Sequence, residues 1–175
     1  MILAIPGSLR RSSINAAALR AAANAAARDG LAVTIDDSPR ALPHFNPDLE
    51  PFPSEAVRRF RQVCADAGGL LLAVPEYTFD IPGAFKNALD WTVGSGSLYR
   101  KPIAVLHVAP AGRGERVREA LTHVLRAHNA YITDHHVPIT HRDRDADGEI
   151  TDPVVEQLRT VVAQLAQRTS ASQAA

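Results

Sequence analysis

The chain has 175 residues, of which 46% are hydrophobic, so it is long enough for one domain with a substantial core. Nineteen basic and nineteen acidic residues balance, which argues against a broad basic surface for nucleic acid or anionic lipid. The single cysteine excludes an intramolecular disulfide and fits a reducing compartment. No apolar stretch is long enough to span a bilayer, and the first residues lack a basic leader. We therefore expect a cytoplasmic protein whose partner is a small molecule.

Short apolar segments alternate with longer segments of helical periodicity along the chain. We expect strands at residues 2–5, 32–35, 70–74, 103–108 and 131–137, and helices at 13–28, 54–67, 82–93, 114–127 and 153–167. This alternation predicts an α/β domain over residues 1–168, in which helices cover both faces of a doubly wound, five-stranded parallel sheet. The natural strand order is the flavodoxin-like 2-1-3-4-5. Residues 169–175 are of low complexity, and we expect them to form a disordered tail.

The segment after the first strand, residues 7–15, reads Gly-Ser-Leu-Arg-Arg-Ser-Ser-Ile-Asn and leads into a helix. A helix N-terminus leaves backbone N–H groups free and carries the positive end of the peptide dipoles, so it favours an anion. Side chains of the segment add hydroxyl, amide and guanidinium donors, from Ser8, Ser12, Ser13, Asn15 and Arg10. The segment predicts a phosphate site. The alternative is an ordinary helix cap formed by Ser12 or Ser13.

The segment after the third strand, residues 75–83, lies at the same switch point of the predicted sheet, where ligands bind in such folds. Pro75 ends the strand and Pro82 suits the first turn of a helix, so the backbone between them is expected to face the crevice. Such a backbone suits the pyrimidine edge of a flavin, with Tyr77 and Phe79 as walls for the ring. The alternative is that both are partly buried loop aromatics.

Residues 7–15 and 75–91 together resemble the NAD(P)H-dependent FMN reductase family, which includes quinone, chromate and azo-dye reductases, and residues 42–50 resemble it more weakly. The resemblance implies noncovalent FMN, reduction by NADPH or NADH, and homodimers or homotetramers. It places the FMN phosphate at Ser8, Arg10, Ser13, Ile14 and Asn15. It places the isoalloxazine at Pro75, Glu76, Tyr77 and Thr78.

Two segments depart from the family pattern. Thr78 stands where the family usually has Asn, so a hydroxyl replaces one amide contact. Residues 109–116, after the fourth strand, are shorter than the corresponding family segment, and Arg113 replaces a glycine. That segment normally approaches the flavin, so these departures leave its contacts open, whereas the phosphate segment and the ring segment are both present.

The resemblance implies an oxidoreductase that takes hydride from NAD(P)H onto FMN and passes electrons to quinones, free flavin, azo compounds or metal oxyanions. The alternative is an FMN-binding electron carrier or redox sensor without turnover of a free substrate. Carriers of that kind tend to be acidic, so the balanced charge favours the enzyme. A phosphatase of similar topology would need a cysteine in the first segment, which has none. The histidines lack the spacing of a ligand set, and we expect no metal site.

Overall fold

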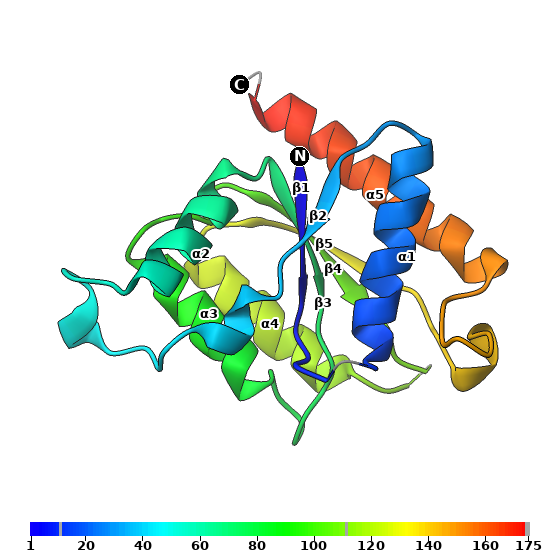
Figure 1. Ribbon diagram of the computed structural model, residues 1–175, viewed down its shortest axis with the longest axis horizontal. Coiled ribbons are helices and arrows are strands. Elements are labelled where there is room, and N and C mark those ends of the chain that lie inside the picture. Colours follow the sequence, from blue (N-terminus) through cyan, green and yellow to red (C-terminus); the bar gives the residue numbers. More distant parts are fainter. Residues whose placement is uncertain (11, 111, 174–175) are drawn as a thin grey trace.

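The structure is a computed structural model that describes residues 1–10, 12–110 and 112–173 (Figure 1). Five strands form one parallel sheet in the order β2-β1-β3-β4-β5, which confirms the predicted topology. The strands are β1 (Ile2–Pro6), β2 (Val33–Ile35), β3 (Gly69–Ala73), β4 (Pro102–His107) and β5 (Tyr131–His136). The helices are α1 (Ile14–Arg28), α2 (Glu55–Asp66), α3 (Gly83–Val93), α4 (Glu115–Ala127) and α5 (Asp152–Gln173).

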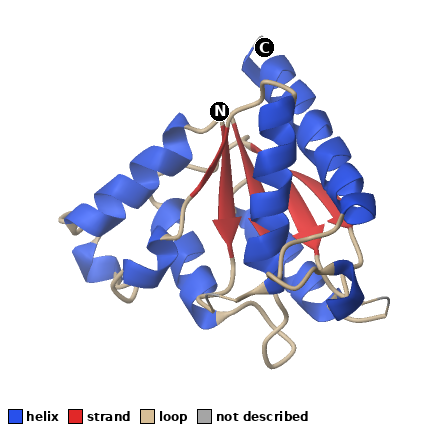
Figure 2. Cartoon of the chain, turned by 45° about the vertical axis from the view of Figure 1, so that its right-hand side comes forward, coloured by secondary structure: helices blue, strands red, loops and turns tan. Residues whose placement is uncertain are grey.

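Helices cover both faces of the sheet, as the continuous apolar strands predict (Figures 1 and 2). Helices α1 and α5 lie on one face, and α2, α3 and α4 lie on the other. Alternate residues of β1 serve the two cores, because successive side chains of a strand point to opposite faces. Ile2 and Ala4 pack in the core with Leu19 of α1, and Leu3 and Ile5 pack in the core with Phe60 of α2.

The long connection between β2 and α2 packs against α3. The side-chain amide of Asn87 accepts a hydrogen bond from the backbone N–H of Phe45 (2.7 Å) and donates one to the carbonyl of Pro43 (2.9 Å). The indole N–H of Trp91 also donates to the Pro43 carbonyl (2.8 Å), and the rings of Phe45 and Trp91 meet edge to face at 5.0 Å. These contacts fix the connection as a packed surface segment.

The last helix is longer than the sequence indicates. Where we expected a disordered tail at residues 169–175, the structure continues α5 through Gln173, and residues 174–175 lie outside the described part. A Cβ on Gly69 would lie 2.6 Å from the methyl carbon of Thr169, so this helix packs directly on the start of β3. Among the described helices, none combines the length and apolar character needed to cross a membrane.

Candidate functional site

Two adjoining cavities, of about 360 and 280 Å³, open where β1, β3 and β4 end. We call them together the crevice, because five residues line both of them: Ile14, Asn15, Pro75, Val108 and Pro110. The crevice lies at the switch point of the sheet, between β1 and β3, as expected for this strand order. Of the nine residues suggested by the sequence, eight line it: Ser8, Arg10, Ser13, Ile14, Asn15, Pro75, Glu76 and Tyr77.

Gly7 brings together the two segments that form the crevice. We call residues 7–15 the first segment and residues 75–83 the second segment. Its backbone N–H donates to the carbonyl of Ala73 at the end of β3 (2.8 Å). A Cβ at this position would lie 2.8 Å from the Val74 Cγ1, closer than side chains approach, so only glycine fits without a shift. The close approach sets the start of the first segment beside the start of the second.

The first segment is held by local hydrogen bonds. The Ser13 hydroxyl oxygen accepts from the backbone N–H of Asn15 (3.2 Å), so Ser13 caps α1, and this part of the ordinary-cap interpretation is confirmed. The Arg10 Nε donates to the Ser12 hydroxyl (3.0 Å). The buried hydroxyl of Ser8 shares a hydrogen bond with the Tyr77 hydroxyl (2.9 Å), which links the two segments. The cap is compatible with an anion site, since capping leaves other first-turn N–H groups free.

Asn15 is the buried polar residue of the crevice. Its side chain is 4% exposed, it lines both cavities, and within the described part of the chain its Oδ1 has no hydrogen-bond partner. A buried polar atom without a partner costs about 1–3 kcal/mol. The crevice therefore offers an acceptor that a donor group of a ligand would satisfy.

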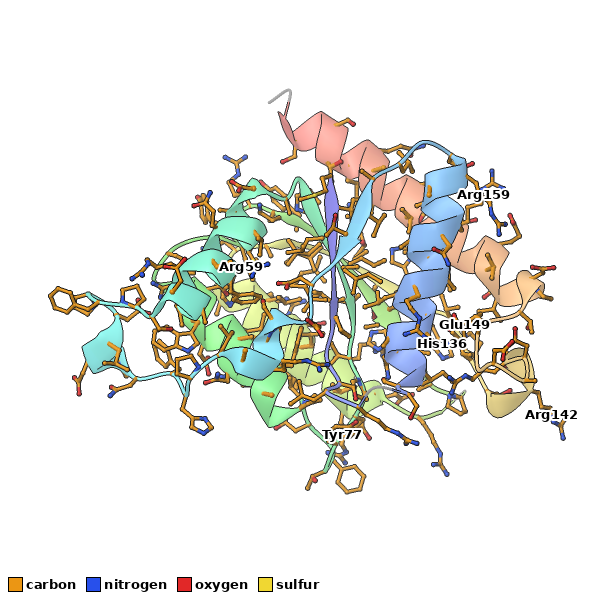
Figure 3. The ribbon with its side chains drawn as sticks, viewed as in Figure 1. Arg59, Tyr77, His136, Arg142, Glu149 and Arg159 are labelled. Carbon is orange, nitrogen blue, oxygen red and sulfur yellow. The ribbon has the colours of Figure 1, made fainter. Side chains whose placement is uncertain are left out.

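The second segment contains a tight two-residue turn. This corrects the expectation that its whole backbone between Pro75 and Pro82 faces the crevice. Tyr77 and Asp80 exchange backbone hydrogen bonds of 3.1 and 3.0 Å, so these groups do not face the crevice. Between them, Thr78 (φ +52°) and Phe79 (φ +62°) both have left-handed backbones, as in a type I′ turn. Figure 3 shows Tyr77 at the end of the sheet where this turn lies.

The turn places two expected ring contacts outside the crevice. Thr78 lies at its tip and is not part of the wall. Phe79 is 72% exposed, and the Arg116 guanidinium lies 5.8 Å from its ring. Of the two aromatic walls expected for a flavin, Tyr77 lines the crevice and Phe79 faces solvent.

Glu76 acts on a neighbouring helix. Its Oε2 accepts hydrogen bonds from the backbone N–H groups of Arg116 and Val117, both at 3.1 Å. These are first-turn donors of α4, whose own N-cap, Gly114, has no side chain to satisfy them. The carboxylate also complements the positive end of the helix dipole. Glu76 therefore fixes the second segment to α4, and only its backbone is free to face a ring.

His107, at the end of β4, lies against the carboxylate of Asp134 and lines the crevice. Asp134 also pairs with Arg118 (3.3 Å). Burial is the largest influence on His107 and lowers its pKa below the ordinary value, although Asp134 opposes the shift. The imidazole is therefore neutral at neutral pH.

The contacts of residues 109–116 were left open by the sequence, and the structure places Pro110 of that segment in the wall, next to Val108 at the end of β4. The sequence did not identify Ile139, Thr140 and Arg144, which follow β5 and also line the crevice. The Arg144 Nε donates to the carbonyl of Gly148 (2.7 Å), which fixes this side chain at the crevice. The segment after β5 carries no motif, so no local signal could have identified it. Residue 111, in the segment after β4, lies outside the described residues.

Comparisons with known proteins agree with the geometry. The family model described as NADPH-dependent FMN reductase matches residues 1–144. A 2-hydroxy-1,4-benzoquinone reductase of Burkholderia sp is 34% identical over 122 residues, which cover 68% of this chain and 66% of that protein. "Probable NADPH:quinone oxidoreductase 2" of Oryza sativa subsp. japonica is 32% identical over 170 residues, which cover 89% and 81%. The flavoenzyme NAD(P)H:(acceptor) oxidoreductase FerB of Paracoccus denitrificans superposes with a TM-score of 0.80 at 25% identity, covering 95% of this chain and 97% of that one.

Proposed function

The chain belongs to the NADPH-dependent FMN reductase family, and from this premise we propose that it is an oxidoreductase that uses FMN and NAD(P)H to reduce a small-molecule acceptor. The observation that carries the proposal is the crevice at the switch point, where a helix N-terminus and the Tyr77 wall lie side by side. When bound, FMN supplies hydride and electron transfer, and the protein supplies its binding, orientation and electrostatics.

The residues of the crevice fit FMN at both ends. We propose that the phosphate lies at Ser8, Arg10, Ser13, Ile14 and Asn15, where first-turn N–H groups and the Arg10 charge favour an anion. The unpartnered Asn15 Oδ1 is an acceptor, so it supports a hydroxyl donor of the ligand beside the phosphate, such as the ribityl hydroxyls of FMN. We propose that the ring lies against Pro75, Tyr77 and the backbone of Glu76. Thr78 then acts through the shape of the turn, since its side chain lies outside the wall.

The acceptor is proposed from the relatives. Their names specify quinones, FMN and azo compounds, so we propose quinones as the first class to test, followed by azo compounds, free flavin and metal oxyanions. The walls of the crevice combine apolar side chains, such as Ile14, Val108 and Ile139, with about as many polar and charged ones, which suits a flat ring that carries polar groups. NADPH and NADH are both proposed as donors.

One spectroscopic experiment separates this function from its alternative, an electron carrier or redox sensor. The protein is saturated with FMN and titrated with NADPH or NADH without oxygen, while the flavin absorbance near 450 nm is followed. We expect the band to bleach and to return when a quinone is added. Bleaching by dithionite but not by either nicotinamide would support the carrier. A protein that fails to take up FMN at micromolar concentration would refute both.

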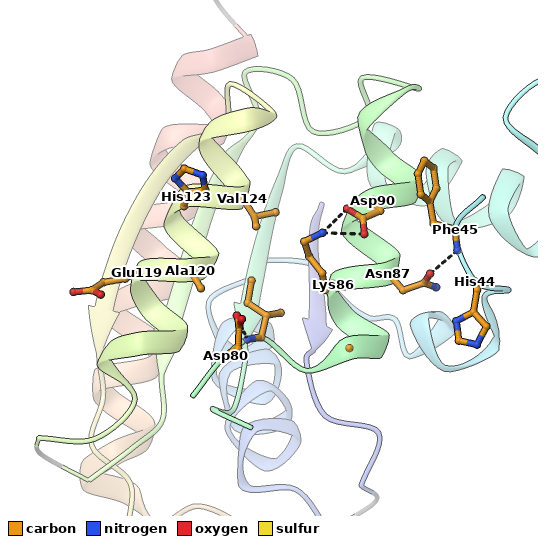
Figure 4. A pocket seen from close by; sticks show the side chains of 12 residues that line it. His44, Phe45, Asp80, Lys86, Asn87, Asp90, Glu119, Ala120, His123 and Val124 are labelled. Atoms are coloured by element: carbon orange, nitrogen blue, oxygen red, sulfur yellow. Dashed lines mark hydrogen bonds and ion pairs between the residues drawn. The ribbon is translucent and has the colours of Figure 1, made fainter. Parts of the chain in front are cut away.

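We also propose that the protein assembles as a homodimer or homotetramer. A groove of about 830 Å³ lies between α3 and α4 (Figure 4). Its wall carries one lysine, Lys86, which pairs with Asp90 (2.7 Å), and two further carboxylates, beside the apolar side chains of Phe45, Ile81, Ala120 and Val124. The apolar side chains support contact with a second copy, because a twofold interface sets the same patch against itself. Light scattering of the protein as it elutes from a size-exclusion column would give its molar mass and so the number of subunits.

A cytoplasmic location is part of the proposal. It is supported by the single cysteine, Cys64, which is buried and not part of a disulfide. Burial raises the pKa of its thiol to about 12, so it is an unreactive core residue. Fractionation of the source cells with an antibody against the protein would test the location.

A further inference from the structure

A separate cavity of about 700 Å³ opens at the opposite end of the sheet, where the strands begin. It lies between the end of α2, the segment before β4, the start of β5 and the last turns of α5, at the end of the molecule where Figure 1 marks both chain termini. Its polar and aromatic wall consists of Asp66, Tyr99, Arg100, Lys101, Tyr131 and Arg168. We call it the amino-end cavity.

The wall carries a local excess of positive charge in a chain whose charges balance overall. Three cations, Arg100, Lys101 and Arg168, face one carboxylate, Asp66. The Lys101 ammonium is already engaged, because it donates to the carbonyls of Cys64 (2.7 Å), Ala65 (2.8 Å) and Ala67 at the end of α2. The two arginines therefore remain as the groups that can meet an anion.

Arg100 is held in a conformation that its residue type disfavours. Its φ of +53° is left-handed, a region that costs free energy for any residue with a side chain. The backbone N–H donates to the Asn129 carbonyl (3.2 Å), and the Nε donates to the Tyr131 hydroxyl (2.8 Å). The guanidinium lies 5.8 Å from the Tyr131 ring centroid. Strained backbone conformations cluster at ligand sites, so the left-handed backbone of Arg100 beside the cavity is a reason to look for a ligand there.

Two tyrosines supply aromatic surface. Tyr99 is 61% exposed and Tyr131 is 45% exposed, and both line the cavity. Tyrosine rings stack on other rings, and guanidinium groups form paired hydrogen bonds with phosphate or carboxylate. The volume lies within the range of small-molecule sites.

We propose that the amino-end cavity binds a planar aromatic ring that carries an anionic group, the chemistry shared by nucleoside monophosphates and aryl carboxylates. The ring lies against Tyr99 and Tyr131, and the anionic group meets Arg100 and Arg168. This site lies at the other end of the sheet from the crevice, so it does not depend on FMN.

Calorimetric titration of the full chain, loaded with FMN and then freed of unbound FMN, tests the site with three probes: adenosine 5′-monophosphate, benzoate and adenosine. Bound FMN keeps the crevice from competing for the phosphate, and removal of the excess keeps free FMN, which is itself a ring with a phosphate, out of the amino-end cavity. We expect adenosine 5′-monophosphate or benzoate to bind, and adenosine, which lacks the anion, to bind at least tenfold more weakly than its monophosphate. If only the nucleotide binds, the ligand class is a nucleoside monophosphate, and if only benzoate binds, it is an aryl carboxylate. Either result supports the site.

Substitutions locate the site. Arg100→Gly removes the guanidinium and suits the left-handed backbone, so we expect at least tenfold weaker binding with no loss of melting temperature. Arg168→Ala should weaken binding similarly. The matched control is Arg59→Ala, an exposed arginine of α2 that does not line the cavity (Figure 3). Flavin absorbance, read separately, should be unchanged in all three variants.

Three outcomes would overturn the proposal. The first is that neither anionic probe binds at millimolar concentration. The second is that both Arg100→Gly and Arg168→Ala keep the affinity of the unmodified chain. The third is that these variants change the oligomeric state and leave probe binding unchanged, which would make this face an interface between copies. None of these outcomes bears on the flavin titration, so the two proposals fail independently.

Discussion

At the scale of single residues, Thr78 adopts a backbone conformation that its side chain disfavours. A β-branched side chain at φ +52° is strained, whereas Asn tolerates this region. Local sequence could not reveal this, because neither Thr78 nor Phe79 is a residue typical of such turns. The left-handed turn is imposed from outside, by the paired backbones of Tyr77 and Asp80 at the end of β3.

We expect Thr78→Asn to raise the free energy of unfolding by about 1 kcal/mol, because it relieves the left-handed strain. Urea unfolding of the flavin-free protein measures the change. Thr78→Val is the control, since it keeps the β-branch and removes only the hydroxyl, and it should give no gain. A stability of Thr78→Asn equal to that of Thr78→Val would mean that the backbone strain is not the cause.

Arg10 carries the prediction for the phosphate end of the crevice. We expect Arg10→Ala to weaken FMN binding at least tenfold, since a charge-assisted hydrogen bond contributes about 1.5–3 kcal/mol and about 1.4 kcal/mol is a tenfold change in affinity. Quenching of flavin fluorescence measures the dissociation constant. Arg28→Ala, at the far end of α1 from the crevice, is the matched control and should bind FMN normally. Equal affinity in both variants would contradict the assignment of Arg10.

At the scale of elements, the alternation of apolar and helical segments was sufficient to predict all five strands and their order. The three central strands, β1, β3 and β4, were predictable because they are buried on both faces and read as continuous apolar segments. The first two site segments were predictable because each follows one of these strands. Arg144 and Ile139 were not, because they reach the crevice only through the folding of the segment after β5.

The end of α5 could not be predicted from its local sequence. Its last turns are rich in Ser, Thr and Ala, a composition that indicates a tail when it is considered alone. The helix continues because Thr169 packs on Gly69, at the start of β3, and a contact between positions 100 residues apart has no local signal.

Glu76 links the second segment to α4, so removal of its carboxylate should destabilise the start of α4. We expect Glu76→Ala to lower the free energy of unfolding by about 0.5–2 kcal/mol, as loss of a helix cap does. Glu76→Gln keeps an acceptor oxygen and loses the charge, so it should cost less than Glu76→Ala. Hydrogen exchange at the Arg116 and Val117 amides, which donate to Glu76, is the direct measurement. Unchanged exchange in Glu76→Ala would show that the cap does not hold in solution.

At the scale of the whole molecule, the two ends of the sheet have different characters. The carboxyl ends of β1, β3 and β4 open into the crevice, and the amino ends open into a cavity rich in arginine and tyrosine. Between them, the two cores are apolar on both sides of the sheet. Two buried histidines, His107 and His128, lie at the ends of β4 and α4, and the half-buried His135 lies on β5. We expect these histidines to make the stability of the chain depend on pH.

Burial is the largest influence on His107, His128 and His135, and it lowers the pKa of each below its ordinary value. The unfolded chain therefore binds more protons than the native one just below the ordinary histidine pKa, about 6.5. Under these conditions the free energy of unfolding rises with pH. Its histidine contribution is complete above about pH 6.5 and is lost as the pH falls toward the native pKa values. The lowered carboxyl pKa values of Asp29 and Asp143 act below the ordinary aspartate pKa of 3.8.

We expect the melting temperature of the flavin-free protein to fall as the pH is lowered from about 7.5 to about 5.5. His128→Gln should reduce this fall, because His128 is buried at the end of α4 and, within the described part of the chain, its Nε2 has no hydrogen-bond partner. The control is His44→Gln, an exposed histidine, which should keep the full pH dependence. A melting temperature that is constant over this pH range would show that the histidines do not stay neutral through burial. An equal fall in His128→Gln and His44→Gln would assign the effect to His107 and His135, on β4 and β5.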